Sequence, residues 1–218
     1  MIRTQATVTI QNVRNLPFVP FMIKTILFDY AGVITPTKNN FLFATKNSKR
    51  FGLSPDELMQ MTYENWGETA LGKLKDSVFW DQIAGKLKIS PEELMSLVIE
   101  TFPVDKRMVE LIRKTKIDHT TVLFSNQIKS WLEKVIDDNK LRNIFNYLVN
   151  SYNVGFRKPD REIFLEALKV TNSKPEETLF VDDSLENVEA AKKMGINAIK
   201  FENFEQFLTE YKKYVNIS

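Results

Sequence analysis

The chain has 218 residues and a hydrophobic content of 43%, so it is long enough to enclose a sizeable core. Its formal net charge is +2, and lysine and arginine are spread along the sequence, which argues against nucleic-acid binding because such proteins usually carry a basic stripe. The absence of cysteine excludes disulfides and cysteine nucleophiles and is typical of a cytoplasmic protein. No stretch reaches the roughly 20 apolar residues that a membrane span needs.

Residues 1–21 form an N-terminal extension that contains no acidic residue and ends before a second methionine, Met22. Residues 6–10 (ATVTI) alternate like a strand, which predicts an additional edge strand. The segment lacks the apolar centre of a signal peptide and the amphipathic pattern of a transit peptide. A mature chain that starts at Met22 is the alternative interpretation.

Five short apolar runs predict the strands of a parallel sheet. The three strongest are Thr25–Phe28, Thr121–Phe124 and Thr178–Val181, and the two weaker ones are Tyr147–Val149 and Ala198–Phe201. Helical patterns cover residues 128–136, 162–170 and 185–194 between these runs, and Gly195 ends the last helix. The alternation predicts an α/β fold with a Rossmann-like, doubly wound parallel sheet.

The interval 37–103 shows no convincing strand pattern. Ser54-Pro55-Asp56-Glu57 and Ser90-Pro91-Glu92-Glu93 each predict a helix start, with serine as the N-cap, proline at the first helical position and glutamate in the capping-box position. We therefore expect an all-helical lobe at residues 37–103, inserted into an α/β core made of residues 22–36 and 104–218.

Ligands of an open α/β sheet bind beyond the carboxyl ends of its strands. The polar residues at those positions are Asp29, Ser125, Asn126, Asp182 and Asp183, and the loop GFRKPD adds Lys158. Each has an ordinary alternative, because Asp183 and Ser125 could cap helices and Lys158 could be a solvated lysine. Three carboxylates at one edge repel each other unless a cation neutralises them, and Mg2+ accepts such oxygen ligands.

The segments FDYAGVI, LFSNQ, GFRKPD and LFVDDSLENVEAAKKMGI, in this order, resemble the four motifs of the haloacid dehalogenase-like superfamily. The resemblance covers residues 23–201, and the helical interval matches the cap of that family. It implies hydrolysis of a small phosphorylated metabolite through an aspartyl-phosphate intermediate. Asp29 is then the nucleophile; Ser125, Asn126 and Lys158 bind the phosphate; and Mg2+ binds to Asp29, the Ala31 backbone carbonyl, Asp182 and Asp183.

Ala31 departs from the pattern of that family. Most of its phosphatases carry a second aspartate at this position, which protonates the leaving oxygen and later activates water. The loss of such an acid and base typically costs about 10² to 10⁴ in rate. A phosphatase that accepts this loss is the favoured interpretation, and three alternatives stay open.

One alternative is a phosphonoacetaldehyde hydrolase, whose first motif also resembles D-x-A-G and whose Schiff-base lysine would come from Lys46, Lys49, Lys73 or Lys75. A 2-haloacid dehalogenase is the second, although it needs no metal and the adjacent Asp182 and Asp183 argue against it. A phosphate- or metal-binding module without turnover is the third.

Several other residues invite a function that the pattern does not support. His119 precedes a predicted strand, about 17 Å from the Ser125 end, and should lie at the wrong edge of the sheet. The aromatic side chains of Trp66, Phe79 and Trp80 have the spacing of a helical core face. Asn187 could support the metal site from behind its ligands.

Overall fold

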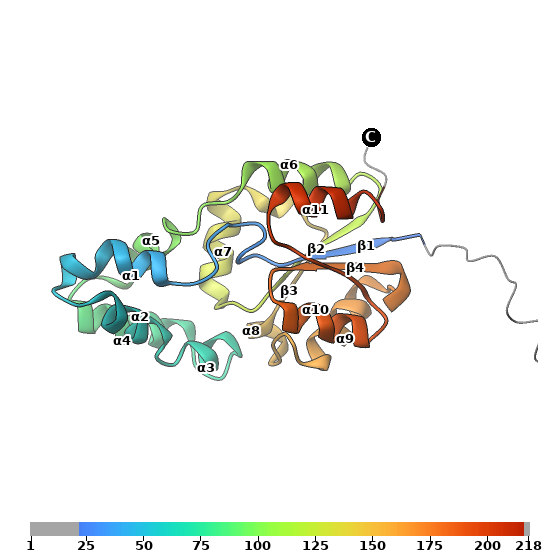
Figure 1. The fold of residues 1–218 in the computed structure, drawn as a ribbon. Coiled ribbons are helices and arrows are strands. Elements are labelled where there is room, and N and C mark those ends of the chain that lie inside the picture. Colours follow the sequence, from blue (N-terminus) through green and yellow to red (C-terminus); the bar gives the residue numbers. More distant parts are fainter. Residues whose placement is uncertain (1–21, 216–218) are drawn as a thin grey trace, which may run out of the picture.

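The structure is a computed structural model and describes residues 22–215 (Figure 1). The predicted edge strand at residues 6–10 and the alternatives for the N-terminal extension lie outside the described residues.

Five parallel strands form one sheet. They are β1 (Thr25–Phe28), β2 (Thr120–Ser125), β3 (Tyr147–Asn150), β4 (Thr178–Asp182) and β5 (Asn197–Lys200). Their order in the sheet is β3-β2-β1-β4-β5, so the direction of strand succession reverses between β1 and β4. All five predicted strands are present, because short β-branched and aromatic runs are buried on both faces in a parallel sheet.

Helices cover both faces of the sheet (Figure 1). One face carries α6 (Lys106–Thr115), α7 (Lys129–Asp138) and α11 (Phe204–Tyr211), and the other carries α9 (Arg161–Thr171) and α10 (Leu185–Lys193). Alternating side chains of each strand enter the two hydrophobic cores, with Phe28 on one side and Leu27 on the other. The predicted doubly wound α/β fold is therefore confirmed.

Short helical elements connect the longer ones. The 3-10 helices are η2 (Ser48–Phe51), η3 (Leu141–Ile144) and η4 (Pro175–Glu177), and a single helical turn, α8 (Ser151–Val154), follows β3. From α8 the chain continues directly into the loop that carries Lys158.

Five helices between β1 and α6 form a lobe, which we call the helical lobe. They are α1 (Phe41–Asn47), α2 (Pro55–Tyr63), α3 (Trp66–Ala70), α4 (Asp76–Leu87) and α5 (Pro91–Ile99). Figure 1 shows the lobe at the end of the molecule that lies beyond the carboxyl end of β1. No strand occurs within residues 41–99. The domain boundaries at residues 36 and 104 stay a prediction.

The two predicted capping boxes have different outcomes. Ser54 and Glu57 form the full reciprocal box at the start of α2. Ser90 accepts a hydrogen bond from the Glu93 backbone N–H at the start of α5, but the return bond from the glutamate is not formed. The reason is a competing charge, because the Glu93 carboxylate pairs with Arg50 instead.

The core of the helical lobe is continuous with the core between the sheet and the helices α6, α7 and α11. Phe79 and Trp80 are 2% and 3% exposed, and Trp66 packs partly buried against the same cluster, as their spacing predicts. The Trp80 ring lies 6.2 Å from the ring of Trp131 on α7, measured between centroids. Apolar packing thus joins the lobe to the α/β core.

Polar contacts join the lobe to the first turns of α7 and α8. An Asp76 carboxylate oxygen accepts a hydrogen bond of 2.6 Å from the Ser130 backbone N–H. The Ser151 hydroxyl donates to the Ala70 carbonyl at 2.6 Å. Gly72 has a φ of +69°, and a Cβ atom there would lie only 2.5 Å from the Tyr152 carbonyl oxygen, so only glycine allows this approach.

Candidate active site

The register of the sheet brings Asp29 and Asp182 side by side. The pairing of β1 with β4 sets Phe28 opposite Val181, and the Asp29 backbone N–H donates to the Val181 carbonyl at 3.0 Å. Asp182 is the next residue of β4, so both carboxylates stand where the strand order reverses. In α/β folds of this type, that reversal is where ligands bind.

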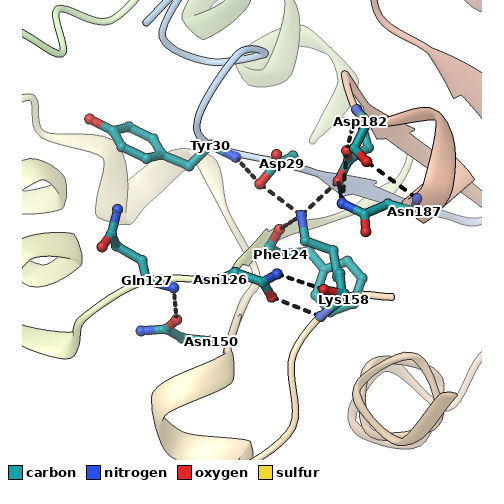
Figure 2. Close-up of polar contacts among 10 residues, drawn as sticks. Asp29, Tyr30, Phe124, Asn126, Gln127, Asn150, Lys158, Asp182 and Asn187 are labelled. Atoms are coloured by element: carbon teal, nitrogen blue, oxygen red, sulfur yellow. Dashed lines mark hydrogen bonds and ion pairs between the residues drawn. The ribbon is translucent and has the colours of Figure 1, made fainter. Parts of the chain in front are cut away.

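Lys158 places its ammonium group between these two carboxylates (Figure 2). Its Nζ atom lies 2.7 Å from Asp29 Oδ1 and 2.7 Å from Asp182 Oδ2, and it donates to the Phe124 carbonyl at 3.0 Å. The residue is 4% exposed, and its Nζ lies 5.2 Å and 5.4 Å from the ring centroids of Phe124 and Phe180. The alternative of a solvated surface lysine is therefore wrong.

Asn126 fixes the loop that carries this lysine. Its side-chain amide accepts from the Lys158 backbone N–H at 2.8 Å and donates to the Lys158 carbonyl at 2.9 Å, as Figure 2 shows. Both bonds go to one residue, so the amide orients the lysine backbone toward the sheet edge. Direct binding of phosphate by Asn126 stays a prediction.

Asp182 is held from several sides. Besides Lys158, its carboxylate accepts a hydrogen bond from the Ser184 backbone N–H at 2.8 Å. The Asn187 side-chain amide donates to its two oxygens at 3.1 Å and 3.2 Å. Asn187 thus contacts the acidic cluster from behind Asp182. Neither oxygen of this buried carboxylate is without a partner.

Asp183 has a more open surrounding than Asp182. Ser184, and not Asp183, is the N-cap residue of α10. Within residues 22–215 the Asp183 carboxylate has a single side-chain partner, the ammonium of Lys38 at 2.8 Å. Gly32, at a φ of +85°, packs so closely that a Cβ atom there would lie 2.5 Å from the Asp183 Cγ atom. A larger residue in place of Gly32 would displace this carboxylate.

The buried position sets the charge state of Asp29. Burial raises the pKa of Asp29 to about 7; Lys158 opposes this shift, and the nearby Asp182 adds to it. Burial alone would lower the pKa of Lys158, but Asp182 and Asp29 outweigh burial and hold this pKa above its usual range. The lysine therefore stays charged at neutral pH.

The three aspartates fit a divalent metal ion. One oxygen each from Asp29, Asp182 and Asp183 lie within 4.8 Å of one another. The donors are all carboxylate oxygens, the ligand type that a hard cation such as Mg2+ prefers. Two of the carboxylates share Lys158, so the buried cluster keeps a negative charge that a cation can balance.

The remaining predicted site residues lie at the expected edge. Ser125 is the last residue of β2 and is 2% exposed. Ala31 follows Asp29 in a turn in which it forms a bridge with Thr35. The phosphate contact of Ser125 and the metal contact of the Ala31 carbonyl stay predictions. His119 lies at the opposite edge, where its Nδ1 is 3.0 Å from the Ile23 carbonyl oxygen.

The lysines considered for a Schiff base do not pair with the acidic cluster within the described residues. Lys46, Lys49, Lys73 and Lys75 are all exposed, and none has an ion pair or hydrogen bond with the acidic cluster in the described part of the chain. The lysine of the lobe segment that does contact the cluster is Lys38, which the sequence interpretation missed. Nothing in its neighbourhood, TPTKNN, marks it, because the contact depends on the path of the chain after β1.

The profile of the haloacid dehalogenase-like hydrolases matches residues 23–195. The chain belongs to this family of hydrolases. This hydrolase is 29% identical over 194 residues to a D-ribitol-5-phosphate phosphatase from Bacteroides thetaiotaomicron. The alignment covers 84% of this chain and 93% of that relative. This hydrolase is 28% identical over 182 residues to a sesquiterpene phosphatase from Aspergillus oryzae, and this alignment covers 79% of this chain and 87% of that relative.

A solved structure shares the fold of this hydrolase. A haloacid dehalogenase family enzyme from Bacteroides thetaiotaomicron, in complex with magnesium and inorganic phosphate, superimposes with a TM-score of 0.71 at 21% identity. The superposition covers 85% of this chain and 98% of the other. Within residues 22–215, this hydrolase has no helix with the length and apolar character of a membrane span.

Proposed function

We propose that this hydrolase is a Mg2+-dependent phosphatase of the cytoplasm that acts on a small phosphorylated metabolite, with Asp29 as the nucleophile. The observation that carries the proposal is the buried cluster in which Lys158 Nζ lies 2.7 Å from both Asp29 and Asp182. Such a cluster combines a nucleophilic carboxylate with positive charge for a phosphoryl group. The phosphatase relatives support the same reaction class.

The two oxygens of Asp29 have different surroundings. Oδ1 accepts the Tyr30 backbone N–H at 2.7 Å and pairs with Lys158. Oδ2 has no hydrogen-bond partner within residues 22–215, so it keeps its lone pairs for attack. The Tyr30 ring points away from the carboxylates (Figure 2), so only the backbone of this residue takes part in the arrangement.

In the proposed reaction, Asp29 Oδ2 attacks the phosphorus atom in line with the ester oxygen. The bond from Oδ2 to phosphorus forms, and the bond from phosphorus to the ester oxygen breaks. Water then attacks the phosphorus of the aspartyl-phosphate and restores the carboxylate. When bound, Mg2+ supplies positive charge to the phosphoryl oxygens. Lys158 and the Ser125 hydroxyl hold the phosphoryl group, while Asn126 keeps the lysine in place.

With alanine at position 31, the first step has no positioned acid and the second step has no positioned base. The leaving oxygen then takes its proton from water, which favours leaving groups that depart without much help. The helical lobe lies beyond the strand ends and acts as a cap, where it excludes bulk water and selects the leaving group. Positioning and charge neutralisation supply most of the rate, as in phosphoryl transfer generally.

The test is phosphate release from an aryl phosphate and a panel of sugar and small-metabolite phosphates, with Mg2+ or with a chelator. We expect release that depends on Mg2+ and falls by at least about 10³ in Asp29→Asn, because the amide is no nucleophile. Circular dichroism checks that the variant is folded. If the Asp29→Asn variant still releases phosphate at the wild-type rate, the role of Asp29 is refuted.

A further inference from the structure

Lys38 lies in the segment between β1 and α1, where the chain leaves the sheet for the helical lobe. Its Nζ atom is 2.8 Å from Asp183 Oδ2, and the two side chains are 59% and 16% exposed. The ammonium therefore stands at the open side of the acidic cluster, whereas Lys158 occupies the closed side. No step of the proposed reaction uses Lys38.

We propose that Lys38 is a second phosphate-binding lysine, which rests on Asp183 in the free protein and transfers to the substrate phosphate when a divalent cation takes Asp183. This inference rests on the proposed function, because it needs a phosphate at Asp29. In this inference, the function of Lys38 is to bind the substrate phosphate and not to stabilise the fold.

Charge balance is the first argument. The three carboxylates, Lys158 and one divalent cation are together neutral, so a phosphate dianion adds two negative charges to a poorly solvated site. Within residues 22–215, Lys38 and Lys158 are the cationic side chains that form ion pairs with the cluster. Lys38 is thus the available group that can reduce this excess charge.

Reach is the second argument. One oxygen each from Asp29, Asp182 and Asp183 lie within 4.8 Å of one another, and Lys38 Nζ already contacts Asp183. A phosphate bound at Asp29 therefore lies within a short movement of a flexible four-carbon side chain. The side chain is 59% exposed, so little packing opposes this movement.

The strength of the resting contact is the third argument. An exposed pair of one lysine and one carboxylate contributes only about 0.2–1 kcal/mol. A divalent ion held by several carboxylates outcompetes such a contact. Lys38 then loses its partner beside the position that the phosphate takes, and an ammonium binds phosphate as a strong point charge.

The chain offers a matched control. Lys24 lies just before β1 and pairs with Glu177 at 2.8 Å, with side-chain exposures of 58% and 17%. This pair has nearly the same distance and exposure as the pair of Lys38 and Asp183, but it lies at the opposite edge of the sheet. Lys24→Met removes an equal surface ion pair without touching the site.

The experiment is calorimetric titration of the full chain with Mg2+ alone, and with inorganic phosphate in saturating Mg2+. In Lys38→Met we expect Mg2+ to bind about two- to fivefold more tightly, because Mg2+ no longer has to displace the ammonium of Lys38 from Asp183. We expect phosphate to bind about tenfold more weakly, because a charge-assisted contact is lost. Lys24→Met should leave both affinities unchanged.

Three outcomes would overturn the inference. Unchanged affinities in Lys38→Met would make the contact an ordinary surface pair, and equal weakening of both ligands would make its role structural. If the wild-type chain binds no inorganic phosphate in saturating Mg2+, the proposed function is refuted as well. The wild-type titration thus separates failure of the function from failure of the role of Lys38.

Discussion

Within residues 22–215, the carboxylate of Asp29 is held by one oxygen and has no hydrogen-bond partner at the other. Lys158 and the Tyr30 backbone both contact Oδ1, so the direction in which Oδ2 faces is fixed before any ligand arrives. Asp182 differs, because contacts from Lys158, Ser184 and Asn187 occupy its carboxylate. These surroundings favour the proposed attack by Asp29 and suit Asp182 to the positioning of Lys158.

At the same scale, Ala31 predicts how the rate depends on the leaving group. We expect Ala31→Asp to accelerate the hydrolysis of alkyl phosphates by about 10² or more, because it restores a positioned acid where protonation limits the rate. Aryl phosphates should gain much less, since their leaving oxygens need little protonation. The measurement is kcat/KM for matched alkyl and aryl esters, because this ratio reports the step that forms the aspartyl-phosphate. An equal gain for both would show that the proton comes from another group.

The sequence predicts some of these residues well and misses others for a physical reason. Asp29 and Asp182 are predictable because each lies at the carboxyl end of a buried strand, and parallel strands align these ends. Lys38 follows no strand, and its contact with Asp183 arises from the path of a loop. Glu93 shows the same limit, since a local capping pattern competes with an arginine that is distant in sequence.

At the scale of elements, α7 begins without a cap of its own. Its N-cap residue, Ile128, has no side chain that accepts a hydrogen bond. Asp76 of α4 supplies the missing acceptor from the helical lobe, at 2.6 Å from the Ser130 backbone N–H. The Trp80 indole N–H donates to the Ser130 hydroxyl at 2.9 Å. A helix of the lobe thus completes a helix of the core.

This contact predicts a loss of stability in Asp76→Ala. We expect the free energy of unfolding to fall by about 1–2 kcal/mol, the usual cost of a lost N-cap. Urea denaturation measures this change. Asp81→Ala is the control, because Asp81 lies on the same helix, is exposed and makes no ion pair in the described chain. Equal effects of both substitutions would contradict the capping role of Asp76.

At the scale of the whole molecule, topology gathers residues that are far apart in the sequence. The strand order β3-β2-β1-β4-β5 sets the ends of β1 and β4 side by side, and the loop after α8 brings Lys158 between them. The positions of the strands along the chain and their parallel type follow from the sequence, because short buried runs alternate with helical patterns. The docking of the helical lobe does not follow, since Gly72 and Asp76 reveal their partners only in three dimensions.

The central claim is that Asp29 becomes phosphorylated, and rapid acid quench followed by peptide mass spectrometry tests it most directly. Because Ala31 leaves the second step without a positioned base, we expect the aspartyl-phosphate to accumulate during turnover of an aryl phosphate with Mg2+, since the first step with such a substrate needs little acid. The peptide that contains Asp29 should gain the mass of one phosphoryl group, and Asp29→Asn should gain none. Steady phosphate release with no added mass on this peptide, or with the mass on another residue, would contradict the account.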